Sequence, residues 1–98
     1  MIVLFVAHLG QIVATPGALV ALAAADTSPS TLLQRHASGD WGDLDAHDRS
    51  AIEAALRDGS SLLSAYIVAE GVKVWIITEA ADENGHRAAT TLLLPEEY

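Results

Sequence analysis

The last third of the chain is dominated by apolar residues that recur with a period of two, the spacing of a β-strand with a buried face. Three such runs cover residues 61–68, 72–79 and 87–94. Residues 69–71 separate the first two runs, and a strong turn sequence, Asp82-Glu83-Asn84-Gly85, lies between the second and the third. The sequence therefore predicts three consecutive strands joined as an antiparallel meander.

The middle run has apolar residues at both sets of alternating positions. One face carries Val72, Val74, Ile76 and Thr78, and the other carries Lys73, Trp75, Ile77 and Glu79. Because neither face is wholly polar, we expect this strand inside the sheet, with helices on one face and a partial cover, such as a second subunit, on the other. Trp75 and Tyr66, on neighbouring runs, are expected in the core, with a binding face as the alternative.

Two hydroxyl-proline pairs mark helix starts upstream of the meander. Thr15-Pro16 and Ser28-Pro29 each place a hydroxyl at the N-cap and a proline at the first helical position. They predict helices over residues 16–25 and 29–36. Leu19 is among the residues expected to face the core from the first of these helices.

The third predicted helix has the clearest caps. Asp45 precedes a helix over residues 46–57, which Asp58-Gly59 closes.

The segment before residue 16 completes the predicted fold. Residues 2–14 are rich in β-branched side chains and predict a strand, or two segments bent about Gly10, that joins the meander as a fourth strand. The expected fold is α+β, a two-layer β-α-α-α-β-β-β domain over residues 1–98 with a mostly antiparallel sheet on helices, residues 1–9 extending the first strand.

The opening of the chain differs from a secretory signal and from a membrane span. It has no Lys or Arg before Arg35, and Gln11, Thr15 and Pro16-Gly17 interrupt its apolar residues. We therefore expect a soluble, cytoplasmic protein.

The charge balance narrows the classes of partner. Thirteen Asp and Glu residues stand against five Lys and Arg, for a net charge of −8. Such a field repels phosphate, so we expect no direct binding of nucleic acid or of anionic membranes, and a basic protein partner instead. The chain has no cysteine, which excludes disulfides, thiolate catalysis and iron–sulfur clusters.

Four acidic residues, Asp40, Asp43, Asp45 and Asp48, fall within nine positions. One interpretation is structural: Asp45 caps the third helix, Asp43 and Asp48 lie near its positive end, and Asp40 orders a turn. A calcium loop beginning at Asp43 is disfavoured, because its sixth and twelfth positions are not Gly and Glu. The third interpretation is an acidic docking surface.

Aromatic and histidine residues near this cluster leave further alternatives open. Trp41 is expected to anchor the loop in the core, with an exposed interface residue as the alternative. His36 at a helix end is explained by the helix dipole, although a metal site using His36, His47 and the aspartates stays an alternative. Ser38 lies near His36 in sequence, but it has no nucleophile motif around it. We predict no catalytic residue, no metal ligand and no cofactor.

Several segments, in order, resemble a family of small bacterial proteins often labelled plasmid-related protein and sometimes carried under a restriction-modification label. These segments are GQIVATPGAL (10–19), RHASGDWGDL (35–44), LSAY (63–66), WIITE (75–79) and ATTLLLPEEY (89–98). The resemblance covers the chain from residue 10 onward. The first nine residues and the longer 80–88 hairpin depart from it.

The resemblance implies a context and no activity, since the family has no established catalytic residue. Its members look like cargo of mobile genetic elements, which implies a non-enzymatic counter-defence factor, such as an anti-CRISPR or anti-restriction inhibitor of a nuclease or surveillance-complex subunit. An acidic surface would occupy the partner's basic nucleic-acid groove, and its candidate residues are Asp40, Trp41, Asp43, Asp45, Asp48 and Glu53. The alternatives are an accessory or regulatory protein that acts through an apolar sheet face or a homodimer interface and, less favoured, a metal-dependent enzyme.

Overall fold

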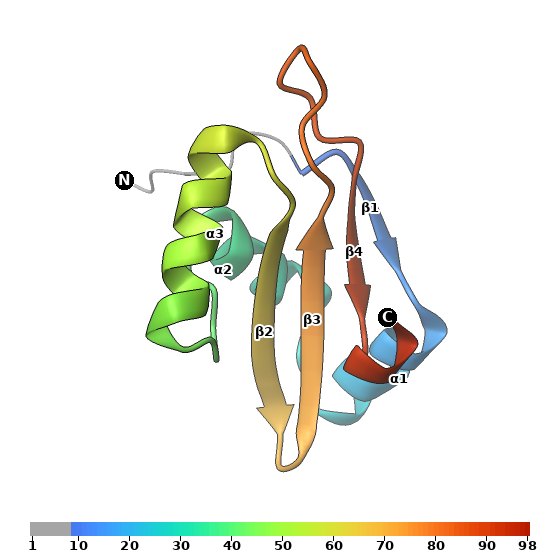
Figure 1. Ribbon diagram of the computed structural model, residues 1–98. Helices are drawn as coiled ribbons and strands as arrows, with labels where there is room; N and C mark the ends of the chain where they lie inside the picture. Colours follow the sequence, from blue (N-terminus) through green and yellow to red (C-terminus); the bar gives the residue numbers. More distant parts are fainter. Residues whose placement is uncertain (1–8) are drawn as a thin grey trace.

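A four-stranded sheet forms the centre of the computed structural model, which describes residues 9–98 (Figure 1). The strands are β1 (Gln11–Ala14), β2 (Leu62–Ala69), β3 (Val72–Thr78) and β4 (Ala89–Leu93), in the spatial order β1-β4-β3-β2. The pairs β2–β3 and β3–β4 are antiparallel, and β1 lies parallel to β4. The predicted meander with an added N-terminal strand is confirmed. The strand and extension predicted over residues 1–8 lie outside the described residues.

Three α-helices precede the meander, as predicted: α1 (Pro16–Ala24), α2 (Pro29–Ala37) and α3 (Ala46–Asp58). Each begins at its expected cap. The Thr15 hydroxyl accepts a hydrogen bond from the Ala18 amide, and the Ser28 hydroxyl accepts one from the Ser30 amide. A short 3₁₀ helix, η1 (Pro95–Glu97), ends the chain. Among the described residues, no helix has the length and apolar character needed to cross a membrane.

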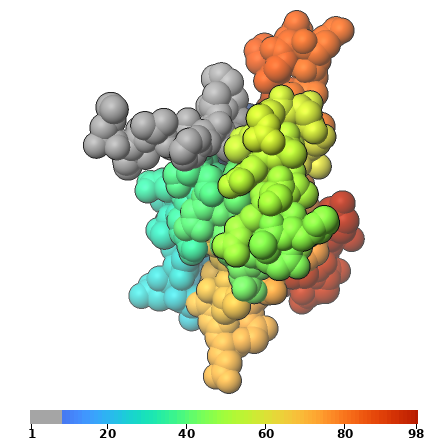
Figure 2. Space-filling model, turned by 60° about the vertical axis from the view of Figure 1, so that its left-hand side comes forward, coloured from blue at the N-terminus to red at the C-terminus, as the bar shows by residue number. Residues whose placement is uncertain are grey.

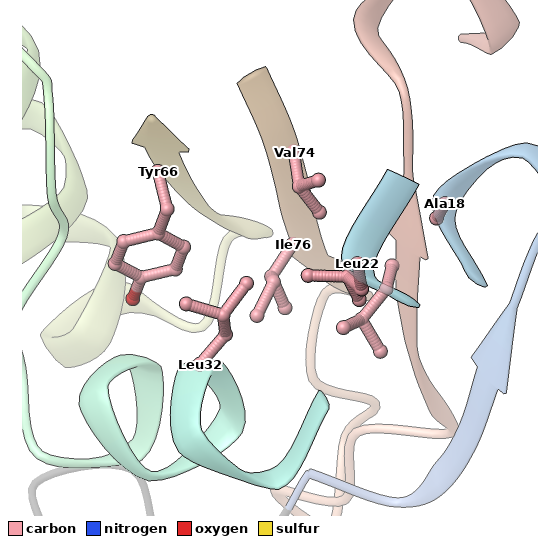
Figure 3. Packing of buried hydrophobic residues seen from close by; sticks show 7 residues of the cluster. Ala18, Leu22, Leu32, Tyr66, Val74 and Ile76 are labelled. Carbon is pink, nitrogen blue, oxygen red and sulfur yellow. The ribbon is translucent and has the colours of Figure 1, made fainter. Parts of the chain in front are cut away.

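The helices cover one face of the sheet. In Figure 1, α1 and α2 lie behind the strands and α3 runs beside the edge strand β2, while Figure 2 shows the hairpin after β3 and the β2–β3 turn projecting at opposite ends. The core between α1, α2 and the sheet, seen in Figure 3, consists of Ala18, Leu22, Leu32, Tyr66, Val74, Ile76 and Leu92. A second cluster under α3 consists of Trp41, Ala55 and Leu62.

Two expectations about burial are wrong. Leu19 is exposed, because α1 turns Ala18, Ala21 and Leu22 toward the sheet, and Leu19 lies about 100° around the helix from Ala18. Trp75 lies on the outer face of β3, half-buried against the ring of Tyr98. The small alanines let α1 approach the sheet more closely than a leucine stripe would.

The segment before α3 covers the outer edge of β2. The Ala65 amide donates to the Trp41 carbonyl, and the Asp43 amide donates to the Ala65 carbonyl. Gly42 between them adopts a φ of +77°, and a Cβ there would overlap the Ala65 carbonyl oxygen. This position therefore requires glycine, both for its backbone conformation and for its closeness to the strand.

Gly42→Ala should lower the free energy of unfolding by about 3 kcal/mol or more, because strain in the left-handed region adds to a backbone overlap. Gly71→Ala is the matched control: its φ is +72°, but nothing lies within 4 Å of the added methyl. This control should cost only the strain, about 1 kcal/mol. Urea unfolding measures both, and equal losses would contradict the role assigned to Gly42.

Candidate functional site

The acidic segment begins with a turn that Asp40 orders. The Asp40 carboxylate accepts hydrogen bonds from Arg35 Nε at 2.6 Å and from the Gly42 amide at 3.1 Å. The bond from Arg35 is the main reason that the pKa of Asp40 lies below its usual value. Because Arg35 pairs with it on the same chain, Asp40 contributes little negative field to the surface.

The same turn is fastened to strand β2. The Tyr66 hydroxyl donates to the Asp40 carbonyl at 2.6 Å, and the Arg35 guanidinium lies over the Tyr66 ring, 4.5 Å from its centre. Burial raises the pKa of Tyr66 to about 12, so the hydroxyl stays a donor at any physiological pH. Arg35, Asp40 and Tyr66 thus form a structural unit.

The next three acidic residues surround the start of α3. Asp43 forms an ion pair with Lys73 on β3 at 3.3 Å. The Asp45 carboxylate caps α3 by accepting from the Asp48 amide at 2.8 Å, and Asp48 itself lies in the first turn, where the helix dipole favours a negative charge. The structural roles predicted for Asp40, Asp45 and Asp48 are confirmed, whereas the contact that Asp43 makes, with Lys73, was not predicted. All four side chains are nevertheless exposed.

Two of the predicted docking residues lie apart from this group. Trp41 is only 3% exposed and anchors the loop, so the alternative of an exposed interface residue is wrong. Glu53 follows Asp48 by five residues, about 140° around α3. It lines a pocket of about 290 Å³ together with Gly39, Trp41, Leu56 and Arg57.

The chain's most enclosed polar cluster was not predicted, and its centre is His36. This side chain is fully buried, with Nδ1 hydrogen-bonded to the Ser64 hydroxyl and Nε2 to the Thr78 hydroxyl. The Thr78 hydroxyl is bonded to that of Thr90, which donates to the Leu9 carbonyl at 2.6 Å. The expectation that the helix dipole explains His36 is wrong, because the ring points into the core rather than along the end of α2.

The Leu9 carbonyl at the end of this series of hydrogen bonds determines which group is the donor in each of them. The Leu9 carbonyl can only accept, so Thr90 donates to it, Thr78 donates to Thr90, and His36 Nε2–H donates to Thr78. Nδ1 is then the acceptor for the Ser64 hydroxyl. The network satisfies a neutral imidazole completely, and burial, followed by the positive charge of Arg87, lowers the pKa of His36 to about 4.

The pair of Ser64 and His36 contains the residue types of a catalytic nucleophile and its base, but its surroundings differ from those of a catalytic site. Ser64 and His36 are both fully buried, and a threonine hydroxyl stands where a triad has a carboxylate. Both ring nitrogens are engaged by hydroxyls, which leaves His36 no lone pair for a metal. Within residues 9–98, no three His, Asp or Glu side chains form a group suited to a metal ion. We therefore assign the network a structural role.

One signal in the sequence pointed to this network. Ser64, Thr78 and Thr90 all occupy inward positions of their strands, where the alternation calls for apolar residues. Small hydroxyl residues at adjacent inward positions indicate a buried polar group that they must satisfy.

Comparison of the chain with models of known protein families, with curated proteins and with solved structures finds no match. The arrangement of the site's own residues therefore carries the functional argument.

The buried imidazole predicts a specific pH dependence of stability. The pKa of His36 is about 4 when folded and 6.5 in the reference state, so between these values the unfolded chain binds a proton that the folded chain does not. The contribution of neutral His36 to the free energy of unfolding is therefore fully present above pH 6.5. The free energy of unfolding should fall by about 3 kcal/mol as the pH drops to 4. Urea unfolding between pH 7 and pH 4 measures this fall.

His36→Gln should be less stable than the wild type at pH 7 but should lose much less stability between pH 6.5 and 4. His47→Gln, at an exposed position on α3, is the control and should keep the wild-type profile. A wild-type stability that stays constant over this range would contradict the assignment of His36 as a buried neutral base.

Proposed function

We propose that the protein is a non-enzymatic protein-binding factor that recognises a basic partner through one composite surface, the docking face. The docking face comprises the outward residues of β2 and β3 and the acidic margin beside them. Its apolar part consists of Leu63, Ile67, Trp75 and Ile77. Its acidic margin consists of Asp43, Asp45 and Asp48.

The apolar character of this sheet face is the observation that carries the proposal. A sheet with one face in water normally alternates apolar inward residues with polar outward ones. Here five of the six outward residues on β2 and β3, residues 63, 65, 67, 73, 75 and 77, are apolar. Ile67 is 60% exposed, Leu63, Trp75 and Ile77 are half-buried, and Ala65 is buried under the segment before α3. Among the described elements, only η1 lies in front of this face in Figure 1. Exposed apolar surface of this kind is typical of protein-binding sites.

The acidic margin indicates the chemistry of the partner. Asp43 reaches Lys73, which is an outward residue of β3, so the start of α3 directly borders the apolar residues. Lys73 is the one basic residue at those outward positions, and Asp43 already pairs with it. Two of the thirteen acidic residues form ion pairs within residues 9–98. A partner with lysines or arginines around an apolar centre would complement this face.

The resemblance to plasmid-related proteins suggests the class of partner, a cytoplasmic nuclease or surveillance-complex subunit with a basic groove for nucleic acid. Asp40 and Glu53 are not part of the docking face, because Arg35 pairs with Asp40 and Glu53 lies on another side of α3. The electrostatic part of the proposal thus rests on Asp45 and Asp48, which form no ion pair within residues 9–98, with a smaller contribution from Asp43, whose charge Lys73 offsets.

Affinity purification from the native host, followed by binding measurements on the captured protein, tests the docking face. Neutralising its margin by Asp43→Asn, Asp45→Ser and Asp48→Asn should weaken binding about tenfold or more at low salt, with a smaller loss at high salt. Serine at position 45 retains the helix cap. Ile67→Lys should weaken binding at both salt concentrations.

A second triple variant provides the matched control. Asp26→Asn, Glu53→Gln and Glu83→Gln change the net charge by the same amount at exposed positions that are not part of the docking face, and this variant should bind as the wild type does. Equal losses in the two triple variants would mean that net charge alone drives binding. A partner that binds all variants equally would refute the docking face.

A further inference from the structure

The segment that forms the sheet edge opposite β2 has no charged side chain of its own, and the nearest carboxylate is that of Glu97, which accepts a hydrogen bond from the Thr15 hydroxyl at its end. Residues 9–25 contain no Asp, Glu, Lys, Arg or His, and they form β1 and α1. In the sheet order β1-β4-β3-β2, β1 is one edge and β2 is the other. On a chain with a net charge of −8, a second copy meets less repulsion at this edge than at the acidic margin of α3.

The same edge exposes large apolar side chains. Ile12 and Val13 on β1 are 46% and 43% exposed, and Leu19 and Val20 on α1 are 48% and 70% exposed. Helix α1, with the sequence PGALVALAA, has no polar side chain on any side, although one side faces water. A helix that is apolar all round is normally covered on all sides.

Strand β1 also has an unused hydrogen-bonding edge. The amides of Gln11 and Thr15 donate to the Ala88 and Leu92 carbonyls of the β4 side. Because alternate residues of a strand point their backbone groups to opposite edges, Ile12 directs its N–H and C=O away from β4. Among the described strands, none pairs with this outer edge.

We propose that two copies of the protein form a homodimer in which their β1 strands pair edge to edge and their α1 helices pack beside them. Such pairing would join two four-stranded sheets into one and satisfy the outward groups of β1. A two-fold interface brings a surface against itself, so it must be neutral or self-complementary. Residues 9–25 are neutral, whereas the acidic margin of α3 facing its own copy would repel it.

Exposed alanines at positions 23 and 24 of α1 let two such helices approach closely. The dimer leaves the docking face of each copy free, because it uses the β1 edge, whereas the docking face lies on β3 and on β2 at the other edge of the sheet. This inference is independent of the proposed function and can fail or succeed without it.

Sedimentation velocity over a micromolar concentration range tests the dimer. The full chain should sediment with about twice the 10.3 kDa mass of one copy. Val20→Lys places a charge in the neutral surface at a position that is 70% exposed in one copy, and it should weaken dimerisation about tenfold or more. The wild-type dimer should persist at high salt, because apolar contacts and backbone pairing hold it.

Ile12→Pro and Ile12→Ala separate the backbone from the side chain. Both remove the isoleucine side chain, but only proline removes the outward N–H, and edge strands tolerate proline there. The proline variant should dimerise about tenfold more weakly than the alanine variant, because a symmetric interface loses the bond twice. Circular dichroism and the unfolding midpoint establish that each variant is folded.

Ile67→Lys, on the docking face, is the control and should leave the dimer intact. A monomeric wild type over the whole concentration range would overturn the proposal. The proposal would also be overturned if the Val20→Lys and Ile12→Pro variants were folded and dimerised as strongly as the wild type. It would equally be overturned if Ile67→Lys alone dissociated the dimer, since association would then use the sheet face.

Discussion

The buried imidazole of His36 is the constraint around which this fold is organised. Its two hydrogen bonds connect α2 to β2 and β3, and the hydroxyls of Thr78 and Thr90 continue the chain to β4 and the Leu9 carbonyl. A buried polar group left unsatisfied costs several times what a hydrogen bond contributes, so these partners must sit at matching positions on three strands. The register of the sheet and the position of α2 are thereby coupled.

The position of α2 in turn determines what the acidic segment does. The Trp41 ring lies edge-on against His36, with centres 5.6 Å apart, and the following residues pair with the outer edge of β2. This path commits Asp40 to Arg35 and directs Asp43 toward Lys73. The four aspartates look alike in the sequence, but the fold gives them different roles. Asp40 orders a turn, whereas Asp43, Asp45 and Asp48 lie beside the apolar sheet face.

Residues 9–98 present two surfaces with exposed apolar side chains, and the charges around the two surfaces differ. The outer face of β2 and β3 is bordered by carboxylates, which favours a basic partner. The residues of β1 and α1 carry no charge, which favours a second copy of the same acidic chain. Their separation across the sheet allows both to be occupied at once, so a dimer would offer two equivalent docking faces to a partner.

The sequence alone determined the elements of this fold, because their signals are local. Thr15, Ser28 and Asp45 start helices through hydrogen bonds that reach only two or three residues, and the alternation after residue 61 marks the strands. The core anchor Trp41 and the roles of Asp40, Asp45 and Asp48 also followed from neighbouring residues.

Only the tertiary structure decided the parallel pairing of β1 with β4, the outward direction of Leu19 and the burial of His36. Each depends on residues far apart in the chain: His36 lies 28 and 42 positions from the hydroxyls that satisfy it. Helix-end sequence patterns cannot distinguish a histidine that faces solvent from one that faces such partners. The sheet makes that distinction, because it brings the inward hydroxyls of three strands together beneath α2.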